Sequence, residues 1–151
     1  MSDNWQIIQY EPEHALRIAE MNKRQEEEWL PAVDIKKWCN ACKDGGPAYT
    51  MMVDGEPVAC AGIILQEWNK ADAWALLSIL FYHHKIKVYR VMKAGIESLI
   101  AERQLRRVQA FIDPRYPSAV DFIECLGFEF EGRLKKWGPQ SEDFFIFART
   151  N

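Results

Sequence analysis

Apolar and polar residues follow different periods along the chain, and each period predicts an element. The clearest is a helix over 88–103, where apolar residues recur every three or four positions and therefore share one face. An almost wholly apolar run over 71–81 predicts a strand that is buried on both sides. The runs 49–53 and 57–65 flank Asp54-Gly55, a pair that is typical of a two-residue β-hairpin turn.

Shorter patterns and capping residues predict the first elements of the chain. A strand over 5–10 precedes a helix that begins near Pro12, since proline is favoured at the start of a helix. Asp34 is the expected N-cap of a further helix over 35–42. Glycines and a proline at 45–47 end that helix before the hairpin begins.

The C-terminal part of the chain predicts three strands around one short helix. A strand over 107–112 leads into the helix, for which Ser118 is the expected N-cap. Gly127 stands where a residue in the left-handed conformation would end this helix. The strands 128–137 and 143–148 then form a terminal hairpin.

These elements describe one α+β domain over residues 1–151, in the order β-α-α-β-β-β-α-β-α-β-β. Its sheet is expected to be mixed but mostly antiparallel, and flanked by helices. The strands 71–81 and 107–112 should be parallel neighbours, because the helix over 88–103 connects them as a right-handed crossover.

Charge is distributed unevenly along the sequence. The net charge is -3, from 22 acidic and 19 basic residues, which argues against a generally basic protein that binds nucleic acid. Between Lys85 and Arg115, however, eight basic residues stand against three acidic ones, an excess of five positive charges. Such a segment suits an anionic ligand, and a solvated helix face explains it equally well.

The cysteines and the absence of apolar segments bear on the compartment. No charged-then-apolar leader opens the sequence and no apolar run approaches the ~20 residues that span a bilayer, so we expect a cytoplasmic protein with no membrane partner. The four cysteines should then stay reduced. Cys39 and Cys42 have the C-x-x-C spacing of redox and zinc sites. They share an apolar helical face with Ile35 and Trp38, which favours two small core residues and no metal.

The C-terminal segment resembles a known family. A strand, a short helix that ends in Leu126-Gly127-Phe128 and a hairpin that carries Glu131-Gly132 resemble the C-terminal half of the GNAT superfamily of N-acetyltransferases. The order of elements is similar to the GNAT order over the whole chain. The resemblance implies an enzyme that takes an acetyl group from acetyl-CoA and transfers it by direct attack to a primary amine of a small molecule or a peptide.

In this family, the loop before the long helix binds the pyrophosphate of acetyl-CoA through the motif Arg/Gln-x-x-Gly-x-Gly/Ala. Glycines let the phosphates approach the main-chain amides at the N-terminus of the helix. Here the motif falls on His84-Lys85-Ile86-Lys87-Val88-Tyr89, and both glycine positions carry a side chain. A tyrosine at the position of closest approach would crowd a pyrophosphate that main-chain amides hold.

Two interpretations of this glycine-free loop stay open. In the first, Lys85, Lys87 and Arg90 bind the phosphates by side-chain charge, with Val88 and Tyr89 in the same cofactor-binding loop. In the second, the loop has lost CoA binding and the start of the helix is merely basic surface. The helix N-terminus itself persists in both interpretations.

The resemblance also implies roles in catalysis. The family strand whose backbone pairs with pantetheine and polarises the thioester carbonyl matches Leu77 and Ile79. The position of the tyrosine that many members use as the acid holds Ile123, so Tyr116 is the nearest phenol. Glu67 is the candidate base, directly or through water, with a surface carboxylate as the plainer explanation.

A second class of function follows from a looser similarity to GNAT-like proteins of tailed bacteriophages, carried by Val53-Asp54-Gly55-Glu56-Pro57 and the glycine-free loop. It implies a structural or binding protein of phage or prophage origin that transfers no acetyl group, in the host cytoplasm or the virion. A homodimer is open in either class. Trp29, Trp68 and Trp74 could line an acceptor groove or pack in the core.

Overall fold

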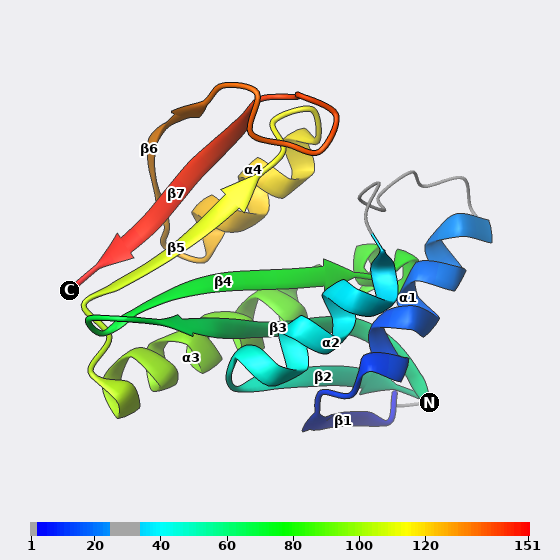
Figure 1. Ribbon diagram of the computed structural model, residues 1–151. Coiled ribbons are helices and arrows are strands. Elements are labelled where there is room, and N and C mark those ends of the chain that lie inside the picture. The colour runs from blue at the N-terminus through cyan, green and yellow to red at the C-terminus, as the bar shows by residue number, and fades with distance from the viewer. Residues whose placement is uncertain (1–2, 25–33) are drawn as a thin grey trace. The chain divides into compact units, whose positions relative to one another are not determined.

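The computed structural model describes residues 3–24 and 34–151, and Figure 1 shows their elements. These residues form seven strands, four α-helices and a short 3-10 helix, η1. In chain order the elements are β1 (Trp5–Gln9), α1 (Pro12–Arg24), α2 (Ile35–Gly45), β2 (Ala48–Val53), β3 (Glu56–Gln66), β4 (Lys70–Leu77), η1 (Ile79–His83), α3 (Lys85–Arg103), β5 (Arg107–Ile112), α4 (Pro117–Cys125), β6 (Glu129–Leu134) and β7 (Phe144–Thr150). The predicted α+β class and order of elements are confirmed.

The seven strands are hydrogen-bonded in the order β1-β2-β3-β4-β5-β7-β6. The pairs β1–β2, β2–β3, β5–β7 and β6–β7 are antiparallel. In contrast, β4 and β5 pair in parallel, with Lys70–Asp72 opposite 107–109. The two strands that the sequence predicted to be parallel neighbours are therefore parallel neighbours, and α3 is the connection between them.

The chain divides into two compact units. The first unit comprises the described residues of 1–64 and 74–88, and the second unit comprises 65–73 and 89–151. Both β4 and α3 run through the two units, so each of these elements contributes residues to both. The side-chain contacts given below lie within one unit or the other.

The core of the first unit lies between α1, α2 and its strands. Its fully buried members are Tyr10, Ala15, Ile18, Cys39, Cys42, Cys60 and, at 1% exposure, Leu76. Cys39 and Cys42 are thus small core residues, as their apolar helical face predicted. Burial raises the pKa of Cys42 to about 12, so this thiol stays protonated at neutral pH.

The apolar run over 71–81 is not a single strand, which corrects the prediction. β4 ends at Leu77, and Ile79 begins the 3-10 helix η1. The cause is Ser78, because its hydroxyl accepts a hydrogen bond from Leu80 N (3.1 Å) and its carbonyl accepts one from Phe81 N (2.9 Å). An apolar run alone does not distinguish a buried strand from a buried helical turn.

A proline and a glycine define the two ends of α4. Its N-cap is Tyr116 and not the predicted Ser118, because Pro117 takes the first helical position, where its fixed φ is favourable and its missing N–H costs nothing. At the other end, Gly127 has a φ of +88°. The N–H groups of Gly127 and the next residue donate to two carbonyls of the last turn, at 2.9 and 3.3 Å, which is the Schellman motif. The predicted glycine cap is confirmed.

The hairpin predicted around Asp54-Gly55 is also confirmed. It joins β2 to β3, and Asp54 (φ +48°) and Gly55 (φ +82°) both have positive φ, as a type I′ turn requires. Asp34 caps α2 as expected, since its carboxylate accepts hydrogen bonds from Lys36 N (3.1 Å) and Lys37 N (3.2 Å). Local sequence signals thus determined these two boundaries.

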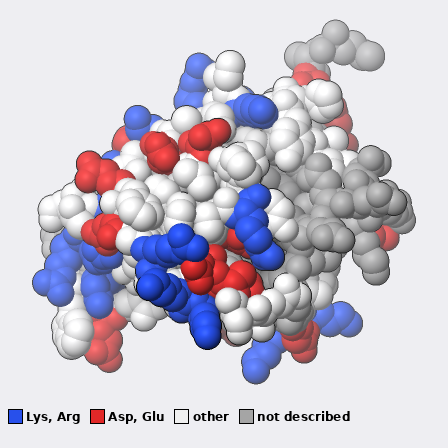
Figure 2. Space-filling model, turned by 90° about the horizontal axis from the view of Figure 1, so that it is seen from above, with Lys and Arg blue, Asp and Glu red and all other residues white. Residues whose placement is uncertain are grey.

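The surface carries charges of both signs. Figure 2 shows Lys and Arg side chains interspersed with Asp and Glu on the face that it displays, with uncharged surface between them. This mixture agrees with the small net charge of -3. Among residues 3–24 and 34–151, no helix is both long and apolar enough to cross a lipid bilayer.

Candidate active site

The segment that links β4 to α3 contains most of the predicted cofactor-binding residues. Leu77 ends β4, and Ser78 N donates to Val58 O on β3 (2.9 Å). Neighbouring residues of a strand direct their backbone polar groups to opposite sides. The carbonyl of Leu77 and the N–H of Ile79 therefore face away from β3, on the side where the resemblance implies pantetheine.

Both of these backbone groups already have a partner, which sequence reasoning missed. Asn22 Nδ2, on α1, donates to Leu77 O (3.0 Å), and Ile79 N donates to Asn22 Oδ1 (3.1 Å). Asn22 is only 1% exposed. Its one signal in the sequence is a polar residue directly after the apolar positions of the first helix.

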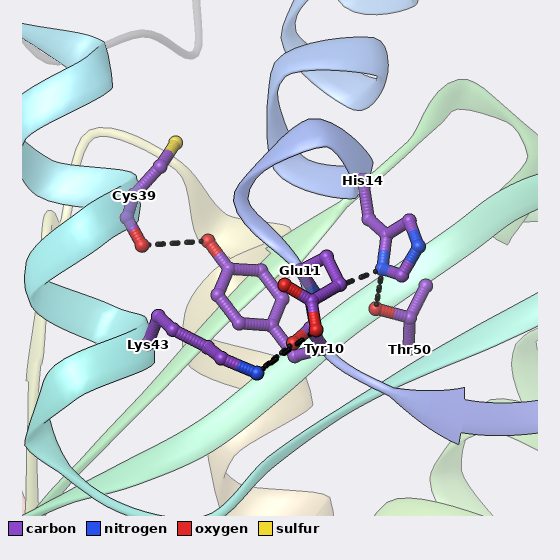
Figure 3. A network of polar contacts seen from close by, with 6 residues as sticks. All are labelled: Tyr10, Glu11, His14, Cys39, Lys43 and Thr50. Atoms are coloured by element: carbon purple, nitrogen blue, oxygen red, sulfur yellow. Dashed lines mark hydrogen bonds and ion pairs between the residues drawn. The ribbon is translucent and has the colours of Figure 1, made fainter.

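A network of polar contacts holds the start of α1, the helix that carries Asn22 (Figure 3). His14 Nδ1 accepts a hydrogen bond from Glu11 N (3.0 Å) and lies within hydrogen-bond distance of the Thr50 hydroxyl (2.8 Å). Lys43 Nζ, on α2, donates to Tyr10 O (3.1 Å). These contacts join α1 to β2 and the segment directly before α1 to α2, and they hold the start of α1 within the first unit.

The N-terminus of α3 presents exposed positive charge. Its first helical bond is Val88 N to His84 O (3.0 Å), so the N–H groups of 85–87 precede the helical ladder and point out of its N-terminus. Lys85, Lys87 and Arg90 are exposed. Backbone N–H groups and cations at one helix start are suited to bind phosphate groups.

Aromatic rings support the two lysines of this first turn. Lys85 Nζ lies 5.5 Å from the ring centroid of Tyr82, and Lys87 Nζ lies 5.2 Å from that of Trp5. His84, at the first position of the family motif, packs edge-on against Trp5 with centroids 4.9 Å apart. The lysine charges are thus held close to the helix start while their ammonium groups stay at the surface.

The other two predicted loop residues pack inward. Val88 is fully buried, and its N–H is used by His84 O. The ring of Tyr89 packs against Phe122 of α4, with centroids 5.1 Å apart, and burial raises the pKa of its hydroxyl. Tyr89 and α4 both belong to the second unit. A contact of Val88 or Tyr89 with a cofactor stays a prediction.

The two predicted proton-transfer residues come from the second unit. Tyr116 is half-buried at the turn between β5 and α4, where Tyr116 N donates to Asp113 O (3.2 Å). The pKa of Asp113 is lowered: burial alone would raise it, but the hydrogen bonds from Arg115 outweigh that effect. Ile123, at the position of the usual family tyrosine, is 5% exposed and packs in the interior.

Glu67 lies in the exposed turn between β3 and β4. Leu77 is at the far end of β4, and an eight-residue strand at ~3.3 Å per residue is about 26 Å long. A base needs hydrogen-bond reach to the attacking amine, directly or through one water. The role of Glu67 as the base stays a prediction. A separation of this length from Leu77 argues against it, because the amine must attack at the carbonyl that Leu77 and Ile79 are predicted to polarise.

The tryptophans divide between surface and interior. Trp68 is 70% exposed beside Glu67 and adopts a φ of +61°. Trp74 packs edge-on against Tyr10 (centroids 5.1 Å apart) and Trp38 (5.5 Å), and its Nε1 is a buried donor without a hydrogen-bond partner in the described part of the chain. Trp29 lies outside the described residues. Core packing therefore accounts for Trp74.

A chain of polar side chains crosses the strands of the second unit, and sequence reasoning missed it. Arg107 makes a two-pronged ion pair with Glu131, and its Nε donates to Gln109 Oε1 (2.9 Å). Gln109 Nε2 donates to Asp72 (2.9 Å), which also accepts from Gln66 (3.2 Å). Both carboxylate oxygens of Asp72 are therefore engaged.

Comparison with known proteins identifies the fold. The sequence matches no protein-family model and no curated protein. The structure is similar to the microcin C7 self-immunity acetyltransferase MccE in complex with acetyl-CoA and AMP (TM-score 0.77, 14% identity, 99% of this chain and 94% of that one). It is also similar to the ribosomal-protein-S5-alanine acetyltransferase from Vibrio fischeri (TM-score 0.75, 16% identity, 100% of this chain and 95% of that one). A GNAT-family acetyltransferase from Streptococcus pneumoniae is similar as well (TM-score 0.73, 16% identity, 97% of this chain and 99% of that one). The chain therefore has the GNAT fold, as its sequence predicted.

Proposed function

We propose that the protein is an N-acetyltransferase that uses acetyl-CoA as the acyl donor and a primary amine as the acceptor. The observation that carries this proposal is the start of α3, where Lys85, Lys87 and Arg90 are exposed around the N–H groups that precede the helical ladder, directly after β4 and η1 of a GNAT fold. The similar MccE was solved with acetyl-CoA, and a Mycobacterium smegmatis RimJ of similar fold was solved with CoA-disulfide.

The phosphates of the donor would be held mainly by side-chain charge. Ammonium and guanidinium groups replace the glycine-framed amides of the family motif, and the dipole of α3 adds to their attraction for an anion. Tyr89 does not obstruct this arrangement with its ring, because that ring packs on Phe122. The glycine-free loop is thus compatible with phosphate binding. Because this binding depends on side-chain charge, it should weaken with added salt more than binding by main-chain amides does.

The reaction is a direct transfer. The neutral amine attacks the thioester carbonyl carbon, a C–N bond forms, and the C–S bond breaks to release the thiolate of CoA. The amine gives its proton to water or, as the sequence predicts, to Glu67, and the thiolate takes one from water or from Tyr116. A thiol with a pKa near ~8.5 is a good leaving group with little acid help, so the loss of the family tyrosine at Ile123 is tolerable.

The acceptor is proposed only as a class, a primary amine of a small molecule or a peptide. Proteins of similar fold include a ribosomal-protein-S5-alanine acetyltransferase and a spermidine N-acetyltransferase from Vibrio cholerae, so the fold serves both kinds of amine. Spermidine and related polyamines are therefore the first acceptors to assay, followed by peptides with a free N-terminus.

Calorimetric titration with acetyl-CoA tests the proposal. We expect binding that weakens as salt is raised, and at least a tenfold loss of affinity in Lys85→Ala/Lys87→Ala. The matched control is Lys36→Ala/Lys37→Ala, which removes two exposed lysines from the first turn of α2. There the Asp34 carboxylate already accepts hydrogen bonds from the backbone N–H groups of both lysines. No heat at millimolar acetyl-CoA, or an equal loss in both double variants, would contradict the proposal.

One alternative is supported by a specific observation. Because no glycine occurs over 84–89 and Asn22 already binds the Leu77 and Ile79 backbone, a binding or structural protein of GNAT fold without acetyl transfer is the second candidate. This is the role that the looser resemblance to phage proteins implies. Release of free CoA thiol in the presence of a polyamine mixture, measured with a thiol reagent, would argue against it.

A further inference from the structure

The carboxamide of Asn22 imitates one amide unit of a neighbouring strand. It donates through Nδ2 to the carbonyl of Leu77 (3.0 Å) and accepts through Oδ1 from the N–H of Ile79 (3.1 Å). A carbonyl and the N–H two residues later are the pair that a parallel strand engages through a single residue. Asn22 therefore closes this end of β4 with the same hydrogen bonds that an added strand or an extended amide ligand would make.

Pantetheine is such a ligand, since it is an extended chain with two secondary amides. The backbone groups of Leu77 and Ile79 face away from β3 and are the positions where the resemblance implies pantetheine pairing. Both backbone groups are bonded to Asn22, which at 1% exposure fills the space in front of them. The side chain and the donor amide cannot occupy this place together.

We propose that Asn22 is a built-in competitor of the acyl donor, and that its carboxamide must leave Leu77 and Ile79 before pantetheine can pair with β4. The inference rests on the proposed function. Asn22 thereby sets the affinity for the pantetheine arm without touching the phosphates, which bind at the start of α3. Donor binding would exchange one pair of hydrogen bonds for an equivalent pair and would cost the burial of Asn22.

Removing the competitor should tighten donor binding. In Asn22→Ala the two backbone groups lose their partner in the free protein and regain one from pantetheine, so we expect acetyl-CoA to bind about tenfold more tightly. Adenosine 3′-phosphate 5′-diphosphate carries the phosphates but no pantetheine, and its affinity should not change. Asn151→Ala is the matched control, because it removes an asparagine that donates to a backbone carbonyl elsewhere, Leu105 O (3.2 Å).

Calorimetry on both variants separates the possible results. Tighter binding of acetyl-CoA alone in Asn22→Ala supports the proposal, and so does binding that appears only in this variant. Unchanged or weaker acetyl-CoA binding by the folded variant overturns the inference and leaves the proposed function intact. If neither wild type nor variant binds acetyl-CoA, both the inference and the proposed function fail.

A second measurement uses the wild-type chain and does not depend on how the variant folds. The side-chain NH2 resonances of Asn22 report its hydrogen bond to Leu77. They should shift when acetyl-CoA saturates the protein and stay in place when adenosine 3′-phosphate 5′-diphosphate does. Resonances that do not respond to bound acetyl-CoA would show that the carboxamide remains in place, which overturns the inference.

Discussion

Single side chains decide whether the backbone at the end of β4 is open to a ligand. Ser78 ends the strand by bonding to Leu80 N, and Asn22 then takes the two polar groups that face away from β3. Neither residue is charged or large. Their effect comes from hydrogen bonds in a buried place, where an unpaired amide would cost more than a paired one contributes.

Proton transfer to the leaving thiolate is tested at Tyr116. If its hydroxyl is the general acid, Tyr116→Phe should lower kcat by ~10²-fold, with little change in the affinity for acetyl-CoA, because the phenyl ring retains its packing. Steady-state kinetics with a saturating amine measures this effect. Normal turnover in the variant would leave water as the proton donor.

Glu67→Gln tests the other half of that mechanism. A carboxylate that accepts the amine proton should make the rate rise with pH, and this dependence should disappear in the variant. The length of β4 separates Glu67 from Leu77 and argues against this role, so the pH–rate profile is the decisive measurement. Superimposable profiles for wild type and variant would remove Glu67 from the mechanism.

The buried thiols predict a stability that falls at alkaline pH. Burial raises the pKa of Cys42 and of Cys60 to about 12, from an ordinary value near 9. Because the fold favours the protonated thiols, this stability is complete below pH ~9 and is lost as the pH rises towards 12. Each such thiol can contribute a slope of up to ~1.4 kcal/mol per pH unit.

Urea unfolding between pH 8 and 10.5, with a reductant present, measures that slope. We expect Cys60→Ala to be less stable at pH 8, because it leaves a cavity, and to lose part of the alkaline slope. Cys125→Ala is the control, since Cys125 is exposed and its removal should leave the slope unchanged. Equal slopes in all three proteins would refute a contribution from the buried thiols.

At the scale of elements, capping residues predicted two of the helix ends. Asp34 at the start of α2 and Gly127 at the end of α4 act through bonds to residues two to four positions away. Such signals can be read from the sequence because both partners lie within it at short range. The start of α4 was predicted wrongly, because Pro117 occupies the first helical position and Tyr116 is therefore the N-cap.

The two glycines of α3 and α4 give a paired test of this local logic. Gly127→Ala should destabilise the protein by ~1–2 kcal/mol, because its φ of +88° is strained for any residue with a Cβ. Gly95→Ala should stabilise it by ~0.5–1 kcal/mol, since Gly95 lies inside α3 with open space around its position. Thermal or urea unfolding of both variants checks the signs, and effects of the same sign would contradict the argument.

The strand predicted over 71–81 failed at this same scale for a different reason. Apolar residues predominate in both Lys70–Leu77 and Ile79–His83, so the hydrophobic pattern did not change where the strand ended and η1 began. Only Ser78 marked the boundary, and a single serine within an apolar run is a weak signal. Apolar content predicted the type of element incorrectly and burial only in part, because Ala71 and Leu76 are buried and the rest of β4 is half-buried.

At the scale of the whole molecule, the fold could be predicted from this one sequence, although no sequence comparison supported it. The similar structures share only 11–18% identity with this chain, yet their TM-scores are 0.71–0.77. Periodicity, turn residues and the crossover rule depend on the pattern of residue types and not on their identity. That is why the order of elements and the parallel β4–β5 pair could be predicted from one sequence.

The sequence by itself therefore determined the order of elements, the hairpin at Asp54-Gly55 and the basic first turn of α3, since each depends on neighbours within a few residues. Only the tertiary structure brought Asn22 to Leu77, 55 positions away, and Arg107 to Glu131 across the second unit. A polar side chain carries no local sign of a distant partner. Its role is decided by which backbone or charge the fold places in front of it, because a buried polar group must find a hydrogen bond there.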